Sequence, residues 1–416
     1  TPDANTHLLL HFHDNYVDSS ASAHTVTPNG NTNLNFDGKF VKDTEFFIYY
    51  GNQTVSDALY SDDLTNPAET STRAFADSEF NNLRTMMRQN IEHPSCTTCY
   101  RNEDSGIESE RQIRNREYIK NYENIKITDT SIPTMLDLRL SNKCNLKCRM
   151  CNEIASSQIA KEKFIDPAIT EVSSELIIEH LKDIKELRLL GGEPSLTPQC
   201  FDILTKLIEC DNTDINIVIT TNATSAKQSW FDLIKHFPNV KWQFSIDSVG
   251  KINDYIRTNS VYSKLKDTIK RYRIIGKDYP NWKYTISQTI QIYNLTSYFK
   301  LSDDLGDLVD EYDAVSPLSW PDKLNIKNLP WSIRQKYINL PHHDTIRIIL
   351  SQPENDPVTT YELMTEFTKY TEHLDLIRGT SFSDIDSELW NDIRNYVTDN
   401  YVTLNHHLKN NSMWGE

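Results

Sequence analysis

Three closely spaced cysteines carry the strongest chemical signal in the chain. Cys144, Cys148 and Cys151 are spaced CxxxCxxC, which places three thiols on one loop. Three thiolates bind three irons of a cubane cluster and leave the fourth iron without a protein ligand. Such an open position is what catalysis at a metal needs, whereas a closed site is structural. A zinc site completed by a fourth ligand elsewhere is the alternative interpretation.

A glycine pair forms the second signal. Gly191, Gly192, Glu193 and Pro194 follow a predicted strand at 187–190 and lie 40 residues after Cys151. Two glycines let the backbone approach a ligand closely, and carbonyls with a carboxylate can hold an ammonium group. Taken alone, the four residues are also typical of a plain strand-to-helix turn.

Polar residues end two further predicted strands. Thr221 and Asn222 close a strand at 215–221, whereas Ser245 and Asp247 close a strand at 241–246. Arg257 follows within the next segment. Ordinary polarity at strand ends is the alternative interpretation at each of these positions.

Alternating strands and helices position these residues. Strands are predicted at 135–140, 186–190, 215–221, 241–246, 284–292 and 312–315, with helices at 173–181, 198–209, 227–237 and 261–274. This order predicts parallel βαβ units and an α/β fold. Because a full eightfold barrel takes about 250 residues, we expect a partial (β/α)6 TIM-like barrel with its chemistry at the carboxyl ends of the strands.

Four regions are predicted. Residues 1–75 are polar, with strands expected at 6–13 and 46–50 and a weak similarity to a jelly roll over 8–38. Residues 76–131 are expected to be helical, beginning at Ser78, and to include a CxxC pair. The core barrel is expected at 132–318. Residues 319–416 are expected to be a helical extension divided by prolines.

The CxxxCxxC loop and the Gly-Gly-Glu-Pro turn, in this order, resemble the radical SAM superfamily. The resemblance implies a [4Fe–4S] cluster on Cys144, Cys148 and Cys151, with S-adenosylmethionine chelated to the open iron. Reduction by a donor such as flavodoxin or ferredoxin would cleave this cosubstrate to a 5′-deoxyadenosyl radical, which abstracts hydrogen from a substrate.

The same resemblance implies cosubstrate contacts. The backbone of Met150, at a position that is usually aromatic, would meet the adenine. The turn at 191–194 would contact the methionine amino group. Ser245 or Asp247 would meet the ribose or the methionine carboxylate, and Arg257 would pair with that carboxylate.

Other positions follow the superfamily pattern less closely. Asn222 stands in a Thr-Asn-Gly position where Ala223 replaces the glycine. Residues 288–294 resemble the fifth strand, near the adenine.

A second cysteine pair, Cys96 and Cys99, resembles the segment before the core in radical SAM proteins with a twitch domain, as do 321–330 and 374–379. An auxiliary cluster there would need two more ligands, and Cys200 and Cys210 are the cysteines that remain. A zinc knuckle, a redox pair or two unligated thiols are the alternatives.

Composition limits the partners. The chain has 416 residues, with 43 Lys and Arg against 59 Asp and Glu, a net charge of −16, which argues against a nucleic-acid partner. Five of seven cysteines lie in two clusters, as is typical of metal binding in a reducing compartment, so we expect a cytoplasmic protein. No apolar run approaches the roughly 20 residues that span a bilayer, so no membrane segment is expected.

The substrate stays open. By analogy with related proteins, we favour modification of a peptide or protein. A small molecule such as a sugar or nucleotide is the alternative. A non-catalytic metal-binding or interaction protein that retains the barrel is a third hypothesis. A carbohydrate-binding or adhesive remnant fused to the enzyme is a separate hypothesis for residues 1–75.

Overall fold

The computed structural model describes residues 134–412 apart from 167–173, 179–180 and 314, together with 46–50 and a set of positions from 86 to 116 that includes 96–104. The predicted strand at 46–50 is present as β1 (Phe46–Tyr50). The predicted strand at 6–13, the jelly-roll similarity and the start of the predicted helix at Ser78 lie outside the described residues.

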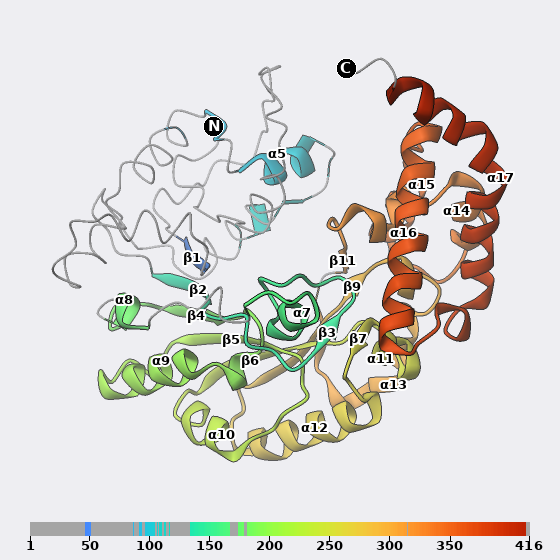
Figure 1. The fold of residues 1–416 in the computed structure, drawn as a ribbon. Helices are drawn as coiled ribbons and strands as arrows, with labels where there is room; N and C mark the ends of the chain where they lie inside the picture. The colour runs from blue at the N-terminus through green and yellow to red at the C-terminus, as the bar shows by residue number, and fades with distance from the viewer. Residues whose placement is uncertain are drawn as a thin grey trace. The chain divides into compact units, whose positions relative to one another are not determined.

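The chain divides into two units, of which the first comprises residues 1–143, 166–219 and 228–240. Here β1 pairs in parallel with β2 (Met135–Arg139), β2 pairs with β4 (Glu186–Leu189), and β4 pairs with β5 (Asn216–Thr221) (Figure 1). The register sets Leu136 opposite Leu187 and Leu187 opposite Ile217, and all three side chains are buried. Side chains alternate along a strand, so one face of these strands forms an apolar layer.

Helices accompany these strands, notably α9 (Pro198–Glu209) and α10 (Gln228–Ile234). Pro198 begins α9 because its fixed φ suits the first helical position. The buried residues of α9 recur at helical spacing: Cys200, Ile203, Leu204 and Leu207. Cys200 therefore belongs to the packed face of a helix.

The second unit comprises residues 144–165, 220–227 and 241–416. In it β6 (Asn239–Ser245), β8 (Lys283–Ser287) and β10 (Glu311–Tyr312) are parallel. Trp242 and Phe244 of β6 pack edge-on against Tyr272 of α12 (Tyr262–Ile275), with ring centroids 4.7 and 5.3 Å apart. Parallel strands alternating with helices confirm the predicted α/β class. Closure into a partial barrel stays a prediction.

The predicted strand at 284–292 is wrong beyond Ser287. Residues after it form β9 (Thr289–Ile290), paired with β11 (Ser316–Pro317), and then a 3-10 turn, η4 (Ile292–Asn294). The Asn294 side chain accepts the Gln291 N–H at 2.8 Å and donates to the Thr289 carbonyl at 2.9 Å. These side-chain bonds take the backbone groups that a longer strand would pair.

The predicted strand at 312–315 also differs from the structure. Residues 312–315 are predicted as one strand, but β10 ends at Tyr312 and β11 begins at Ser316. Two short pairings replace the single strand.

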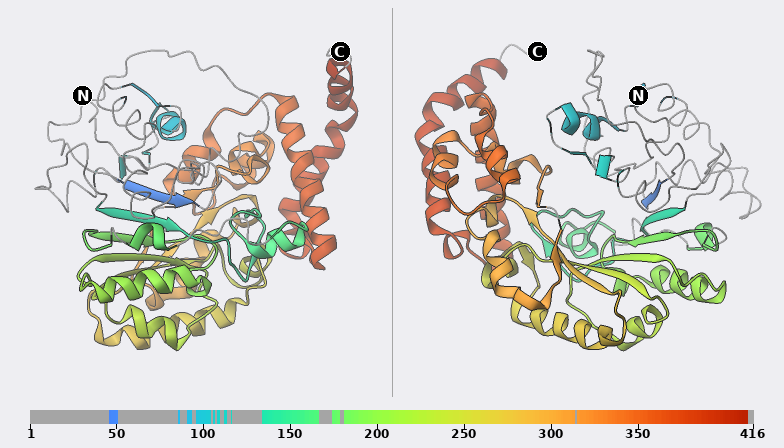
Figure 2. Two further views of the ribbon diagram at one scale, coloured as in Figure 1. Left: turned by 60° about the vertical axis from the view of Figure 1, so that its left-hand side comes forward. Right: turned by 180° about the vertical axis from the view of Figure 1, so that it is seen from behind.

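Residues 319–416 contain α14 (Trp331–Tyr337), α15 (Asp344–Ser351), α16 (Pro357–Arg378) and α17 (Ser387–Ser412). Helices α16 and α17 lie side by side (Figures 1 and 2). Asp356 caps α16 by accepting the N–H groups of Val358 and Thr359, and Pro357 follows at the first helical position. The proline thus begins a helix rather than interrupting one.

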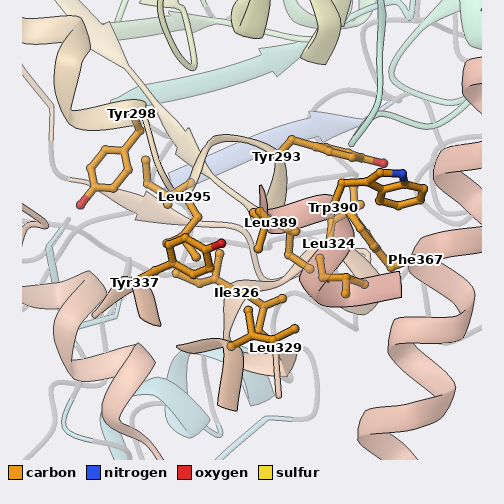
Figure 3. Close-up of a cluster of buried hydrophobic side chains, with 14 of the residues drawn as sticks. Tyr293, Leu295, Tyr298, Leu324, Ile326, Leu329, Tyr337, Phe367, Leu389 and Trp390 are labelled. Carbon is orange, nitrogen blue, oxygen red and sulfur yellow. The ribbon is translucent and has the colours of Figure 1, made fainter. Parts of the chain in front are cut away.

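A hydrophobic cluster, here the C-terminal core, joins these helices to segments at 255–256 and 290–298. Figure 3 shows part of it, including Tyr293, Phe367 and Trp390. Phe382 lies at its centre, with its ring 5.1 to 6.1 Å from the rings of Tyr255, Tyr293, Phe367 and Trp390. The C-terminal extension therefore packs on segments that belong to the predicted barrel.

Among the residues that the structure describes, no helix is both long and apolar enough to cross a membrane.

We expect Phe382→Ala to lower the free energy of unfolding by about 3–5 kcal/mol, because it opens a cavity among aromatic rings. Urea denaturation measures this. The control is Leu376→Ala on α16, whose side chain is 82% exposed and which should stay within about 0.5 kcal/mol of the parent. Equal effects of the two substitutions would contradict the packing described.

Candidate active site

Hydrogen bonds hold the CxxxCxxC loop in place along its length. Its β3 (Lys147–Cys148) pairs antiparallel with β7 (Arg257–Thr258), which sets Cys148 opposite Arg257. The Cys151 N–H donates to the Cys148 carbonyl at 3.1 Å. The Ser156 hydroxyl donates to the Leu146 carbonyl at 2.7 Å and caps α7 (Ser157–Glu162). The spacing of the thiols is thus set by hydrogen bonds on both sides of the loop.

The three thiols lie close enough to affect one another. Burial raises the pKa of Cys151 far above its usual range, and negative charge on Cys148 and Cys144 would raise it further. Burial also raises the pKa of Cys148. Buried thiols therefore hold their protons until a cation replaces them, which is how metal binding favours the thiolate.

Three thiols on one loop are a donor set that suits an iron–sulfur cluster. Within the described parts of the chain, no three His, Cys, Asp or Glu side chains are arranged to hold one metal ion. In a cubane each thiolate binds a different iron, so its cysteines need not converge on one point. Cys144, Cys148 and Cys151 supply three such thiolates.

Asn222 lies beside the first cysteine. Its side-chain amide donates to Asn145 Oδ1 at 2.9 Å and lies 3.8 Å from Cys144 Sγ. Thr224 donates its hydroxyl and backbone N–H to Asn222 Oδ1, at 2.6 and 3.0 Å. The amide orientation is therefore fixed, and its N–H groups face the loop.

Ala223 adopts a backbone conformation that suits glycine. Its φ is 55°, in the left-handed region where a Cβ costs roughly 1–2 kcal/mol. The resemblance leads us to expect glycine here, so the alanine places strain directly after Asn222.

Asp247 and Arg257 form a buried pair beside the second cysteine. Arg257 Nε and Nη2 donate to the two carboxylate oxygens at 2.8 and 3.1 Å, and Arg257 Nη1 lies 4.0 Å from Cys148 Sγ. Asp247 Oδ1 also accepts the Thr289 N–H at 3.1 Å. Burial, opposed by the Asp247 charge, leaves the pKa of Arg257 above its usual range. A permanent positive charge thus faces Cys148.

This pairing bears on the expected role of Arg257. Two of its donors already hold Asp247, which leaves Nη1 toward the cysteine loop. Pairing with a cosubstrate carboxylate stays a prediction.

In the first unit, the Gly-Gly-Glu-Pro turn is packed on the backbone before the cysteine loop. Gly191 has φ 106°, and a Cβ on Gly192 would lie 2.4 Å from the Lys143 carbonyl oxygen. The Glu193 N–H donates to that same oxygen at 2.8 Å. Both glycines are therefore required by geometry, the first by its dihedral angle and the second by close approach.

The carboxylate of this turn has local partners. Glu193 is buried, and its Oε1 accepts from the Ser195 N–H at 3.3 Å and the Ser195 hydroxyl at 2.7 Å. The Thr197 hydroxyl donates to the Glu193 carbonyl at 3.1 Å. These bonds begin the 3-10 turn η2 (Pro194–Leu196) and orient the carboxylate.

The remaining predicted residues are more dispersed. Met150 is partly buried and packs against the C-terminal core. Ser245 ends β6, in register with Ser287 of β8. Cys96 and Cys99 are buried on and just before α5 (Thr97–Asp104) in the first unit. Cys210 ends α9 at its C-cap.

Several residues at the loop lack a role in the predicted site. Arg149, inside the motif, forms contacts with Asp375 and Thr380. Arg378 donates to the Lys147 carbonyl at 2.9 Å. The resemblance at 374–379 pointed to this segment, but nothing in its local pattern indicates a contact with residues more than 200 positions earlier.

Comparison with known proteins bears on the central part of the chain. Residues 138–287 match the family model of the Radical SAM superfamily, which confirms the predicted superfamily for this domain. The cofactors of this superfamily are a [4Fe–4S] cluster and S-adenosylmethionine.

Two curated relatives match parts of the chain. The S-adenosylmethionine-dependent nucleotide dehydratase RSAD2 of Siniperca chuatsi is 22% identical over 205 residues, 48% of this chain and 52% of that protein. The sporulation killing factor maturation protein SkfB of Bacillus subtilis is 27% identical over 149 residues, 34% of this chain and 33% of that protein. The chain thus spans about half and about a third of the lengths of these relatives.

Solved structures show more distant similarity. Streptococcus suis SuiB bound to precursor peptide SuiA is similar over 58% of this chain and 55% of that chain, with 18% identity and a TM-score of 0.35. Native anSMEcpe with bound AdoMet is similar over 59% of this chain and 62% of that chain, with 14% identity and a TM-score of 0.35.

We expect Gly192→Ala to lower the free energy of unfolding by about 1–3 kcal/mol, because its Cβ meets backbone that cannot rotate away. The control is Gly306→Ala, where a Cβ meets no atom within 4 Å and the positive φ alone is strained. Urea denaturation compares the two. A smaller loss for Gly192→Ala than for Gly306→Ala would contradict the close approach.

We expect Ala223→Gly to raise the free energy of unfolding by about 0.5 kcal/mol, because relief of left-handed strain exceeds the entropic cost of glycine. Ala160→Gly, within helix α7, is the control and should cost about 1 kcal/mol. Thermal and urea unfolding measure both. Equal losses in the two variants would show that Ala223 is unstrained.

Proposed function

We propose that the chain is a radical SAM enzyme that cleaves S-adenosylmethionine reductively at a [4Fe–4S] cluster on Cys144, Cys148 and Cys151 and then abstracts hydrogen from a substrate. One observation carries the proposal. The three-thiol loop, with Asn222 and Arg257 against two of its cysteines, lies inside the part of the chain that matches the superfamily model.

The bound cluster and S-adenosylmethionine supply the electron transfer and the radical. The protein binds and orients them. Cys144, Cys148 and Cys151 are the iron ligands. Arg257 places a positive charge at Cys148, which favours the thiolate that binds iron. Burial of Cys148 and Arg149 keeps water away from this part of the loop, which protects reactive intermediates from side reactions.

Cosubstrate binding is proposed at the turn residues and at the strand ends. The oriented carboxylate of Glu193 and the carbonyls around it suit the methionine ammonium. Ser245, Asp247 and Arg257 suit the ribose and carboxylate, and the Met150 backbone suits the adenine. An electron donor of the flavodoxin or ferredoxin class would reduce the cluster.

For the substrate we propose a peptide or protein. The support is the match to SkfB, whose name describes maturation of a sporulation killing factor. The match to RSAD2, named a nucleotide dehydratase, supports a nucleotide as the second candidate. The similarity to twitch-domain proteins at 321–330 and 374–379 is a further part of the proposal. For Cys96 and Cys99 an auxiliary cluster, a zinc knuckle, a redox pair and two unligated thiols are the candidates, and an iron count tests the cluster.

We expect the anaerobically reconstituted protein to produce 5′-deoxyadenosine from S-adenosylmethionine and dithionite, measured by mass spectrometry. The Cys144→Ala, Cys148→Ala, Cys151→Ala variant should produce none, because three cluster ligands are removed. Iron analysis should give about four irons per chain for one cubane, and about eight would indicate an auxiliary cluster.

The alternatives predict other results. A chain that binds four irons and yields no 5′-deoxyadenosine, with peptide or nucleotide candidates present, would favour the non-catalytic hypothesis. Zinc in place of iron and sulfide would overturn the proposal.

A further inference from the structure

We propose that the C-terminal end of helix α16 belongs to the cluster site and holds the cysteine loop in position. Four residues form it, here called the α16 clamp: Tyr370, Asp375, Arg378 and Thr380. We assign Asp375 and Arg378 as positioning residues that hold the loop carrying Cys148 and Cys151. The identity of the bound group rests on the proposed function, whereas the contacts themselves do not.

The first contact of the α16 clamp is with Arg149. This residue lies between Cys148 and Cys151 in the sequence, and its side chain is fully buried. Arg149 Nη2 donates to Asp375 Oδ1 at 2.6 Å and to Thr380 Oγ1 at 2.8 Å. The Tyr370 hydroxyl donates to the Arg149 carbonyl. Both the side chain and the main chain of this motif residue are therefore held by the C-terminal extension.

The segment at 255–256 provides further partners for Arg149. Arg149 Nε donates to the Tyr255 carbonyl at 3.0 Å, and the guanidinium carbon lies 3.6 Å from the centroid of the Tyr255 ring. The Arg149 N–H donates to the Ile256 carbonyl at 2.8 Å. A buried guanidinium needs such partners because an unpaired buried charge is strongly destabilising.

Asp375 is fixed independently of Arg149. Gly379 ends α16 with φ 63°, and its N–H bonds to the Asp375 carbonyl. The chain then turns back, so that the Thr380 hydroxyl and the Phe382 N–H donate to the two Asp375 carboxylate oxygens, both at 2.8 Å. The helix end therefore orients the Asp375 carboxylate toward Arg149 through bonds that do not involve Arg149.

Arg378 forms the second set of contacts of the α16 clamp, and its side chain is 1% exposed. It donates to both carboxylate oxygens of Glu162 on α7, at 2.6 and 3.2 Å. Its Nη1 donates to the Lys147 carbonyl at 2.9 Å and to Thr258 Oγ1 at 3.2 Å. One guanidinium therefore joins β3, β7 and α7, the three elements that surround Cys148.

The two sets of contacts hold the residues on either side of Cys148 in the sequence: Arg378 binds Lys147, and Asp375 binds Arg149. They fix the backbone around this ligand from a helix more than 220 residues away in the sequence. Partners that orient the ligands of a metal are worth about 10–100-fold in metal affinity. The α16 clamp is expected to act in this way, by keeping the thiols at cluster spacing before and after iron binds.

The test uses the full chain with three variants. Asp375→Asn keeps the shape of the side chain and removes its charge. Arg378→Lys keeps the charge and removes the bidentate fork. Glu372→Gln is the matched control on the same helix, since the Glu372 side chain is 52% exposed and pairs only loosely, at 3.8 Å, with Arg394.

The first readout needs no iron. Hydrogen–deuterium exchange of the metal-free protein, followed by mass spectrometry, reports the backbone at 144–158. Asp375→Asn and Arg378→Lys should exchange there about tenfold faster than the parent, because local opening becomes easier. Peptides from α9 should be unchanged, and Glu372→Gln should match the parent throughout.

The second readout uses the reconstituted protein. Iron release to a chelator should be about tenfold faster in Asp375→Asn and Arg378→Lys, with shifted g values in the EPR spectrum of the reduced cluster. Glu372→Gln should release iron at the parental rate. A role in overall stability alone would leave the EPR spectrum of the remaining cluster unchanged.

The outcomes separate the inference from the proposed function. If the parent binds no cluster, the proposed function fails and exchange at 144–158 still decides the role of the α16 clamp. Parental exchange and parental iron release in both folded variants would overturn the inference. If Asp375→Asn loosens the whole chain, Arg378→Lys decides, because it preserves the buried charge: faster exchange confined to the loop supports the clamp, and none refutes it.

Discussion

The burial of one charge, on Arg149, is the constraint on which the site depends. A guanidinium with a fully buried side chain, placed between two cysteines of the motif, is tolerable because three separate segments provide its partners. Those segments are α16, the turn after it, and the end of α11 (Gly250–Ile256), which contributes two carbonyls and the Tyr255 ring. Removing Asp375 of α16 would leave the Arg149 charge without the carboxylate that balances it. The C-terminal core, the helix end and the cysteine loop are therefore energetically one structure.

The electrostatics of the loop follow from the same burial. Desolvation raises the pKa of Cys148 and Cys151, and so opposes the thiolate form that binds iron. Arg257 and Arg378 act in the other direction at Cys148. The guanidinium groups therefore stabilise the thiolate form of Cys148, which is the form that binds a metal.

Local patterns predicted much of the fold. Helix α9 has its predicted bounds because Pro198 marks its start and its buried residues recur at helical spacing. The fifth strand was predicted too long because Ile290 and Ile292 continue the apolar alternation of β8 although side-chain amides of the neighbouring turn take its backbone bonds. Helix α11 has seven residues, too few for periodicity to reveal. Barrel closure depends on long-range pairing that no local pattern encodes.

The site also contains residues that the sequence pattern predicts and residues that it does not. Cys144, Cys148 and Cys151 are found by spacing alone, and Asn222 and Arg257 by their order after predicted strands. The partnership of Arg149 with Asp375 joins residues 226 positions apart, and each looks like an ordinary surface charge in the sequence. The burial of Arg149 and its contact with Asp375 reveal the pair, and both are properties of the folded chain.

The order of synthesis gives the C-terminal position of α16 a consequence for maturation. The cysteine loop leaves the ribosome long before Asp375 and Arg378 exist. At about 5–20 residues per second, the intervening stretch takes some tens of seconds to synthesise. During that time the loop lacks both of its guanidinium–carboxylate anchors. The nascent chain therefore carries its three cysteines without these anchors, and cluster insertion is favoured only once α16 has been synthesised.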